Sequence, residues 1–452
     1  SMDMPDSAFI RVINRRQVLA LAFGAMVGWS WVALTGVWIA GAGALGAMLA
    51  FGIGGGIVIF VGLTYAELAA AMPLVGGEHV YSQRALGSTA SFICTWAILL
   101  GYASVVAFEA VALPTVLEYV LPGFSRGYLW TIAGWDVNVT WVLTGALAAV
   151  AMIVINVIGI RTAARLQALV VVIVLLSGLG LFSGAVVAGD ISNAAPLFSG
   201  GLDGVLSILV MVPFRFVGFD VIPQSAEEID LPFAARGQLL VVSILLAILW
   251  YALVIGAVAI ALPESGRAIS VLPTADAAAA LFNGSWAGKL LVIGGVAGIL
   301  TSWNAFLIGG SRALYALAKA GQVPSMFAVL HPTYRTPHRA ILLVGGLAVF
   351  APLFGRPAMV WLVDAGGLGI VTAYAMVALS FLVLRAREPD MDRPYRVRHG
   401  KVVGYLAFVL SLALASLYLP WSPAALVWPH EWIIVISWCV LGLLFHWFSH
   451  AD

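Results

Sequence analysis

The chain is poor in charged residues and in cysteine. Only 10% of its 452 residues are charged, whereas an average soluble domain has roughly 25%. Together with the 62% of hydrophobic residues, this excludes a soluble globular enzyme and predicts an integral membrane protein. The two cysteines, Cys94 and Cys439, lie in apolar runs and cannot build a disulfide framework. A net charge of +1 gives no basis for binding nucleic acid, so no such partner is expected.

The content of the apolar runs argues against two further classes of protein. A membrane-embedded enzyme would need His, Asp and Glu clustered at ligand spacing, and no run has such a cluster. We therefore expect no enzymatic activity, no catalytic residue, no cofactor and no resident metal. A channel would need a continuous polar stripe through several helices, whereas the charges inside these runs are isolated.

Long apolar runs fill most of the chain. A helix of about 20 apolar residues crosses the ~30 Å hydrocarbon core of a bilayer. We predict an all-α polytopic membrane protein with twelve transmembrane helices, called spans 1 to 12 in chain order. They cover residues 17–43, 46–71, 89–120, 141–159, 164–188, 204–226, 238–262, 286–318, 339–354, 358–385, 402–420 and 430–448.

The basic residues between these spans predict their orientation. Most Lys and Arg residues fall in the loops on the side of the amino terminus, including Arg335, Arg339 and the run 393–401. Loops rich in Lys and Arg stay in the cytoplasm. We therefore expect a multi-pass protein of the cytoplasmic (inner) membrane, in contact with the lipid bilayer, with both termini in the cytoplasm.

Two spans are interrupted by residues that weaken a helix. Span 1 contains Gly24 and Gly28, and span 6 contains the run 213–220, with Pro213, Arg215 and Gly218. Irregular backbone at membrane depth survives only where it is buried in protein or lines a cavity, and a pair of broken helices in matching positions points to a transporter binding site. The alternative for Gly24 and Gly28 is a close-packing helix face.

The two interruptions lie an odd number of spans apart, so the second half of the chain is inverted relative to the first. This predicts a five-plus-five inverted repeat with broken helices 1 and 6. The predicted divisions are a cytoplasmic segment at 1–16, a first repeat of spans 1–5 at 17–188, a second repeat of spans 6–10 at 204–386, and peripheral spans 11–12 at 402–448.

Three segments, 65–87, 311–339 and 218–228, resemble the amino acid–polyamine–organocation (APC) superfamily of permeases. The resemblance covers nearly the whole chain. It implies a secondary active transporter that moves amino acids across the cytoplasmic membrane by alternating access. Glu109 followed by Pro114 resembles ethanolamine-permease-like members, so the alternative is a permease for ethanolamine or another small amine or polyamine.

The chain departs from the superfamily pattern at both interruptions. Gly28-Trp29-Ser30 stands where Gly-Ser-Gly is usual, and Arg215 stands where a small or neutral residue is usual. The open amides at Gly28 to Ser30 are the expected site for a substrate carboxylate. Arg215 either binds an anionic group of the substrate, pairs with Glu109 or Asp220 to gate the cavity, or forms a structural ion pair.

The remaining candidates would hold the amine or shape the pocket. Glu109, midway along span 3, is a candidate for binding a substrate amine or the coupling proton. Carbonyl groups near Val217, Gly218 and Phe219 are further candidates for the amine. An aromatic box for a cation or an apolar side chain is one role for the rings near the breaks, and ordinary core packing is the other. These rings are Trp29, Trp31, Phe214, Phe216 and Phe219.

The coupling ion is left open between H⁺ and Na⁺, and exchange of one substrate for another is left open beside ion coupling. Thr301 and Ser302 in span 8 carry hydroxyl oxygens of the kind that Na⁺ takes, although such groups also bond to their own helix. The resemblance implies that proton-coupled relatives place a lysine in span 5, and counting along the chain puts Val174 near that place. Asp220 and Asp364 are candidates for gating or coupling.

Overall fold

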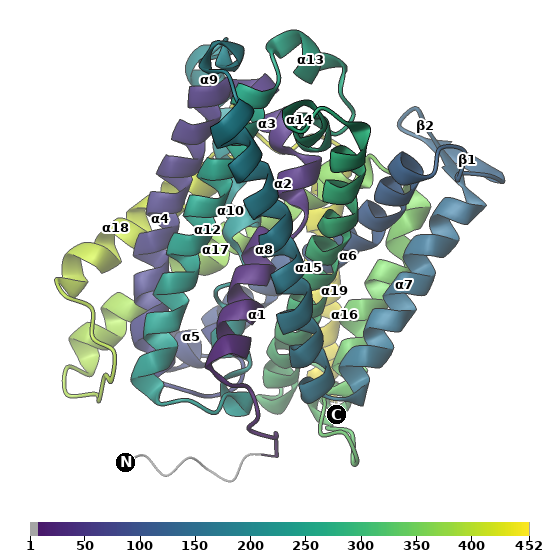
Figure 1. Ribbon diagram of the computed structural model, residues 1–452. Helices are drawn as coiled ribbons and strands as arrows, with labels where there is room; N and C mark the ends of the chain where they lie inside the picture. Colours follow the sequence, from purple (N-terminus) through teal and green to yellow (C-terminus); the bar gives the residue numbers. More distant parts are fainter. Residues whose placement is uncertain (1–7, 452) are drawn as a thin grey trace.

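The computed structural model describes residues 8–451, and these form one helical bundle whose described chain begins and ends at the same end (Figure 1). Within this range, nine helices are long and apolar enough to cross a membrane, or ten if one bent pair counts as a span. The long unbroken helices are α4 (Ala44–Ala71), α6 (Ser88–Val120), α7 (Val139–Ile158), α8 (Ile160–Ala188), α12 (Phe233–Ala261), α15 (Ser285–Lys319), α17 (Ala358–Arg387) and α19 (His430–Ala451). The predicted helical polytopic fold is confirmed, while the count of twelve and the inverted repeat stay predictions.

Two shorter apolar helices occupy the places predicted for spans 9 and 11. They are α16 (His338–Phe350), which continues into the 3₁₀ turn η4 (Ala351–Phe354), and α18 (Gly400–Ser416). Both pack against α17 or its neighbours, and α19 lies largely exposed against α6 and α17.

The two interrupted spans are broken in the structure at the positions that the glycines predicted. The first consists of α1 (Arg15–Val27), α2 (Ser30–Ala33) and α3 (Thr35–Ala42), with a bend of 67° before α3. The second consists of α9 (Gly201–Leu209), α10 (Val212–Phe216) and α11 (Val221–Gln224). α1 packs against α10 and α11, so the two breaks lie side by side in the middle of the bundle.

The connections hold structure that hydropathy did not predict. A short antiparallel hairpin, β1 (Tyr128–Ile132) and β2 (Trp135–Asn138), corrects the expectation that every element is helical. Its two-residue turn, Ala133-Gly134, has positive φ at both positions, as a type I′ turn requires. The remaining connecting elements are α5 (Glu78–Leu86), α13 (Glu264–Ile269), α14 (Pro273–Leu281), η1 (Ile191–Ala194), η2 (Ala226–Glu228) and η3 (Ser325–Ala328).

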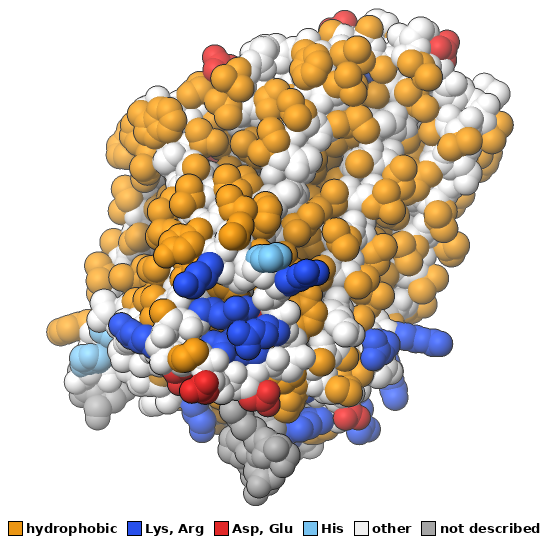
Figure 2. Space-filling view, turned by 90° about the vertical axis from the view of Figure 1, so that its left-hand side faces the viewer, with side chains coloured by type: hydrophobic (Ala, Val, Ile, Leu, Met, Phe, Trp, Pro, Cys, Tyr) orange, Lys and Arg blue, Asp and Glu red, His pale blue; other side chains and the backbone are white. Residues whose placement is uncertain are grey.

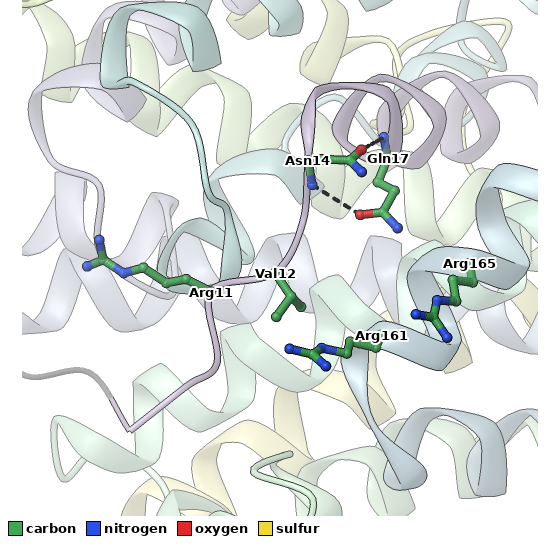
Figure 3. Close-up of a pocket in the computed structure, with 6 residues that line it drawn as sticks. All are labelled: Arg11, Val12, Asn14, Gln17, Arg161 and Arg165. Atoms are coloured by element: carbon green, nitrogen blue, oxygen red, sulfur yellow. Dashed lines mark hydrogen bonds between the residues drawn. The ribbon is translucent and has the colours of Figure 1, made fainter.

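The start of α1 is fixed by a reciprocal cap. The Asn14 side chain accepts a hydrogen bond from the Gln17 N–H, and the Gln17 side chain accepts one from the Asn14 N–H, both at 3.0 Å (Figure 3). Such caps stabilise a helix end by about 1 kcal/mol. The cap borders a pocket of about 440 Å³ that Arg11, Arg161 and Arg165 also line.

Basic side chains gather at the end of the bundle where the described chain, residues 8–451, begins and ends, and we call this the basic end. Figure 2 shows hydrophobic side chains over most of one face and Lys and Arg side chains collected toward this end. A second pocket there is lined by Arg385, Arg396, Arg398, His399 and Lys401. An apolar belt above a basic rim fits a helical bundle that sits in a bilayer.

Candidate functional site

The break after α1 depends on a backbone conformation that glycine adopts easily. Gly28 has φ +52°, and a Cβ placed on it would lie 2.4 Å from the Ser302 Oγ of α15. Its N–H still donates to the Gly24 carbonyl, and the next N–H groups in the ladder, those of Val32 and Ala33, donate to the Trp29 carbonyl. The N–H groups of residues 29–31 therefore stand outside this ladder, as expected for an opened helix.

The break after α10 faces the first one. Val217 is extended, Gly218 has φ +136°, and a Cβ on Gly218 would lie 2.6 Å from the Ala25 Cβ of α1. The Gly218 N–H donates to the Asp220 Oδ1 at 3.0 Å, so the carboxyl group caps the broken segment. The second break thus touches the last turn of α1, and only a residue without a side chain fits there.

Tyr251 of α12 joins the two breaks. Its hydroxyl donates to the Met26 carbonyl at 2.5 Å and lies 3.3 Å from the Arg215 carbonyl, so one side chain contacts backbone on both sides. Sequence reasoning did not select this residue. The sequence feature that could have identified Tyr251 is a hydroxyl in the middle of an apolar run, because a buried polar group at that depth needs a partner.

Arg215 lies at the centre of this arrangement with one edge of its guanidinium unused. The side chain is 2% exposed, and its Nε and Nη2 atoms have no hydrogen-bond partner among the described residues. Its guanidinium carbon lies 4.5 Å from the Phe214 ring centre and 5.7 Å from that of Phe108. The faces of these rings attract the guanidinium cation and leave its Nε and Nη2 edge free for hydrogen bonds.

The same edge binds a carboxylate in three other arginines of this chain. Arg84 and Arg312 use Nε and Nη2 to bind Glu388 and Glu228, and Arg385 uses the same two atoms to bind Glu67. This side-on fork is the geometry in which a guanidinium takes both oxygens of a carboxylate. Arg215 therefore presents, inside the protein, the fork that elsewhere in this chain holds a carboxylate.

Glu109 of α6 lies at the other side of the first break. It is 3% exposed, its Oε1 would lie 3.8 Å from a Cβ on Gly28, and its Oε2 has no partner among the described residues. Within residues 8–451, no ion pair of 4.0 Å or less joins Arg215 to Glu109 or to Asp220. The structure therefore holds a buried acid and a buried base near each other, each with an unused polar atom.

The five aromatic candidates do not surround one point. Trp31 donates to the Gly28 carbonyl at 3.0 Å, Phe216 packs on Tyr251 at 5.4 Å, and Phe219 packs on Tyr65 at 5.2 Å. Trp29 is fully buried beside Gly295. Of the five, Phe214 alone has its ring against the guanidinium of Arg215 within the described chain, and an aromatic box for a ligand stays a prediction.

Of the hydroxyl groups of Thr301 and Ser302 in α15, only that of Ser302 donates to α1. The Ser302 hydroxyl donates to the Ala25 carbonyl at 3.1 Å, across to α1. The Thr301 hydroxyl donates to the Gly298 carbonyl of its own helix at 2.7 Å, which is the ordinary bond of a buried threonine. The other coupling candidate, Asp364, is half-buried on α17 and lies close to Glu431.

α8 packs against α1 one turn before the first break. A Cβ on Gly24 would lie 2.5 Å from the Gln167 Nε2 and 2.8 Å from Val171, so these two residues of α8 face α1 there. The Gln167 amide donates to the Ala20 carbonyl at 3.3 Å and accepts from Asn304 at 3.2 Å. Gln167, Val171 and Val174 recur at intervals of four and three residues, so they share one face of α8, and the expected position near Val174 stays a prediction.

Gly298 of α15 offers a direct test of how tightly the first break is held. A Cβ on Gly298 would lie 2.1 Å from the Gly28 carbonyl oxygen, a backbone atom that cannot turn away. We expect Gly298→Ala to lower the free energy of unfolding by about 1–3 kcal/mol, as overpacking does. Thermal unfolding in detergent measures this effect.

Gly52→Ala is the matched control, because Gly52 lies within α4 and a Cβ there meets nothing within 4 Å. Alanine in an open helical position is expected to stabilise by about 0.5–1 kcal/mol. Equal unfolding temperatures for the two variants would show that the contact at Gly28 is not tight.

Comparison with known proteins places this arrangement among transporters. A family model described as amino acid permease matches residues 13–445. The branched-chain amino acid permease BcaP of Bacillus subtilis (strain 168) is 26% identical over 442 residues, covering 96% of this chain and 92% of that protein. Two further proteins of that organism are similar: a methylthioribose transporter, 23% identical over 98% of this chain and 94% of its own, and an aspartate–proton symporter, 25% identical over 89% and 78%.

Proposed function

Because the chain belongs to the amino acid permease family, we propose that it is a secondary active transporter that carries amino acids across the cytoplasmic membrane by alternating access. The family and the relatives are transporters and not enzymes, which confirms the resemblance on which the sequence prediction rested. The observation that carries the proposal is the buried, unused fork of Arg215 beside two facing helix breaks.

The substrate carboxylate binds the Nε and Nη2 edge of Arg215. Burial of an arginine without a partner is expensive, so a protein keeps it where a ligand supplies the opposite charge. The open N–H groups at Trp29 and Ser30 are a second donor set for the same carboxylate. The named substrates of two of the three relatives, branched-chain amino acids and aspartate, share this group.

The substrate amine binds on the opposite side of the site. The unused Oε2 of Glu109 and the carbonyl groups of Val217 to Phe219 are the acceptors available to an ammonium group. An acid and a base at the two ends of one site suit a zwitterion, because each charged group of the ligand then meets its opposite.

The basic end of the bundle faces the cytoplasm and holds both termini, since basic loops are retained on that side. The helices rock about the facing breaks and expose the site to one side at a time. Transport is driven by H⁺ or Na⁺.

A ligand panel of matched pairs tests the proposal. The purified protein is heated with L-leucine or 3-methylbutylamine, with L-arginine or agmatine, and with L-aspartate or β-alanine. In each pair the second compound is the first without its α-carboxylate. At 100 times its dissociation constant, a ligand stabilises by about 2.7 kcal/mol. We expect at least one amino acid to stabilise the protein and its decarboxylated partner to have no effect.

Two further ligands separate the alternatives. Stabilisation by ethanolamine and the decarboxylated amines alone would replace an amino acid with a small amine as the substrate. Methylthioribose is the substrate named for one relative. Stabilisation by methylthioribose alone would show that the site binds neither charged group of an amino acid.

A further inference from the structure

A second polar cluster lies below the break of α10, toward the basic end. Glu78, at the start of α5, accepts hydrogen bonds from the Tyr65 hydroxyl, at 2.8 Å, and from the Gln224 amide. Asp220, in the broken segment itself, accepts from the Tyr102 hydroxyl and from the Gly218 N–H. Both carboxyl groups are fully buried.

The two carboxyl groups are close together and interact with each other. This joins α5, which lies outside the membrane-spanning helices, directly to the irregular segment beside the substrate site. A change of charge at one carboxyl group therefore acts on the break at Gly218, because the Gly218 N–H donates to Asp220.

Glu78 and Asp220 differ from three other acids of this end, which are bound by arginine. Glu67, Glu228 and Glu388 are each bound by arginine. Within residues 8–451, no Lys, Arg or His nitrogen lies within 4.0 Å of Glu78 or Asp220. Two neighbouring buried carboxyl groups without a cation cannot both ionise cheaply, so they favour holding a proton.

The described surroundings place no positive side chain in contact with either carboxyl group. His79 follows Glu78, but burial lowers the pKa of its imidazole to about 4, so it is neutral near pH 7, and its ring bonds to Ser91 at 2.7 Å. Arg236 is bonded to backbone carbonyls. The other titratable or charged groups facing the cluster come from α4, α5, α6, α15 and α17: Tyr65, Tyr81, Cys94, Tyr102, Arg312 bound to Glu228, and Tyr374.

Several buried polar atoms at the cluster are unused, the Tyr81 hydroxyl among them. The hydroxyl of Tyr374, which is 1% exposed, and the Oε1 of Gln224 have no hydrogen-bond partner among the described residues. The Tyr374 hydroxyl interacts electrostatically with both carboxyl groups, and its ring lies 5.6 Å from that of Phe219, next to Asp220. A spare donor beside a carboxyl pair stabilises the form that has lost a proton.

We propose that Glu78 and Asp220 form a proton-binding site whose occupancy drives the opening of the basic end. This rests on the proposed transport function. A proton from the outer aqueous phase binds to one carboxyl oxygen of the pair and leaves to the cytoplasm from the same oxygen. Its departure raises the charge of the pair by one negative unit, and repulsion between the carboxylates then moves α5 away from the broken segment.

The pKa of Glu78 is consistent with this role. Burial raises it well above its usual value, and the neighbouring Asp220 raises it further. The carboxyl group is therefore poised to hold a proton at pH values where an exposed glutamate would have lost it.

The test compares Glu78→Gln with Glu388→Gln in proteoliposomes. With the membrane potential clamped, an inward gradient of one pH unit should raise accumulation of the labelled amino acid about tenfold in the unchanged protein and in the control, for one proton per substrate. Glu388 is exposed and paired with Arg84, so it serves as a glutamate outside the cluster. Glu78→Gln is expected to lose the gradient response yet keep exchange of labelled for unlabelled substrate.

Tyr374→Phe is the second variant and removes only the spare hydroxyl. It is expected to shift the pH midpoint of uptake upward, because the deprotonated pair loses a donor; a merely structural role would leave that midpoint in place. An unchanged gradient response in Glu78→Gln, or uptake driven by Na⁺ alone, would overturn the proposal. Lack of any ligand stabilisation in the unchanged protein would instead overturn the proposed function.

Discussion

Arg215→Gln is expected to weaken binding of a carboxylate-bearing amino acid by at least about 30-fold, because two hydrogen bonds from a charged donor are lost. The same change should leave the empty protein as stable as before, or more stable. Arg215 has no ion pair within the described residues, so its buried charge is a cost that the neutral amide removes. Ligand titration and thermal unfolding of one sample measure both effects.

Two variants sharpen this test. Arg215→Lys keeps the charge but loses the planar fork, so we expect an intermediate loss of affinity. Arg84→Gln removes the same fork from an exposed pair and should leave the affinity unchanged. A large drop in stability of the empty Arg215→Gln protein, with affinity intact, would instead assign Arg215 to a structural ion pair.

The breaks could be predicted from the sequence because their signal is local. Glycine at Gly28 and Gly218 and proline at Pro213 weaken a helix whatever surrounds them, and both breaks appear where these residues stand. Hydropathy likewise placed the long helices within a few residues. These features follow from short stretches of chain and need no knowledge of the tertiary contacts.

The partners of the polar residues could not be predicted in this way. The free-energy cost of burying a guanidinium predicted that Arg215 has a partner, but only the structure shows that its Nε and Nη2 atoms have none among the described residues. The sequence placed Glu78 only within the segment 65–87 that resembles the permeases. Its contact with Gln224 could not be predicted, because it joins segments that are far apart in the chain. Gln167 was missed for the same reason: its hydrogen bonds with Ala20 and Asn304 join helices that are far apart in the chain.

Arg312→Met is expected to lower the free energy of unfolding by about 3–5 kcal/mol, the usual cost of removing one partner of a buried ion pair. Arg312 binds Glu228 through two bonds of 2.8 and 2.9 Å, and both side chains are 1% exposed. The Glu228 carbonyl also accepts the N–H groups of Val12 and Ile13, so this residue ties the segment before α1 to α15. Unfolding in detergent, by heat or by denaturant, measures the loss.

The double variant Glu228→Gln with Arg312→Met separates the lost attraction from the stranded charge. Because the penalty comes mainly from leaving a carboxylate buried alone, the double variant should recover much of the stability. With the Glu228→Gln single variant it completes a cycle that gives the coupling between the two residues. Breaking the exposed pair with Arg84→Met should cost less than about 1 kcal/mol, because water replaces its partner. A similar loss at both pairs would mean that Arg312 acts through packing, whereas a loss confined to the buried pair identifies the stranded Glu228 carboxylate as its source.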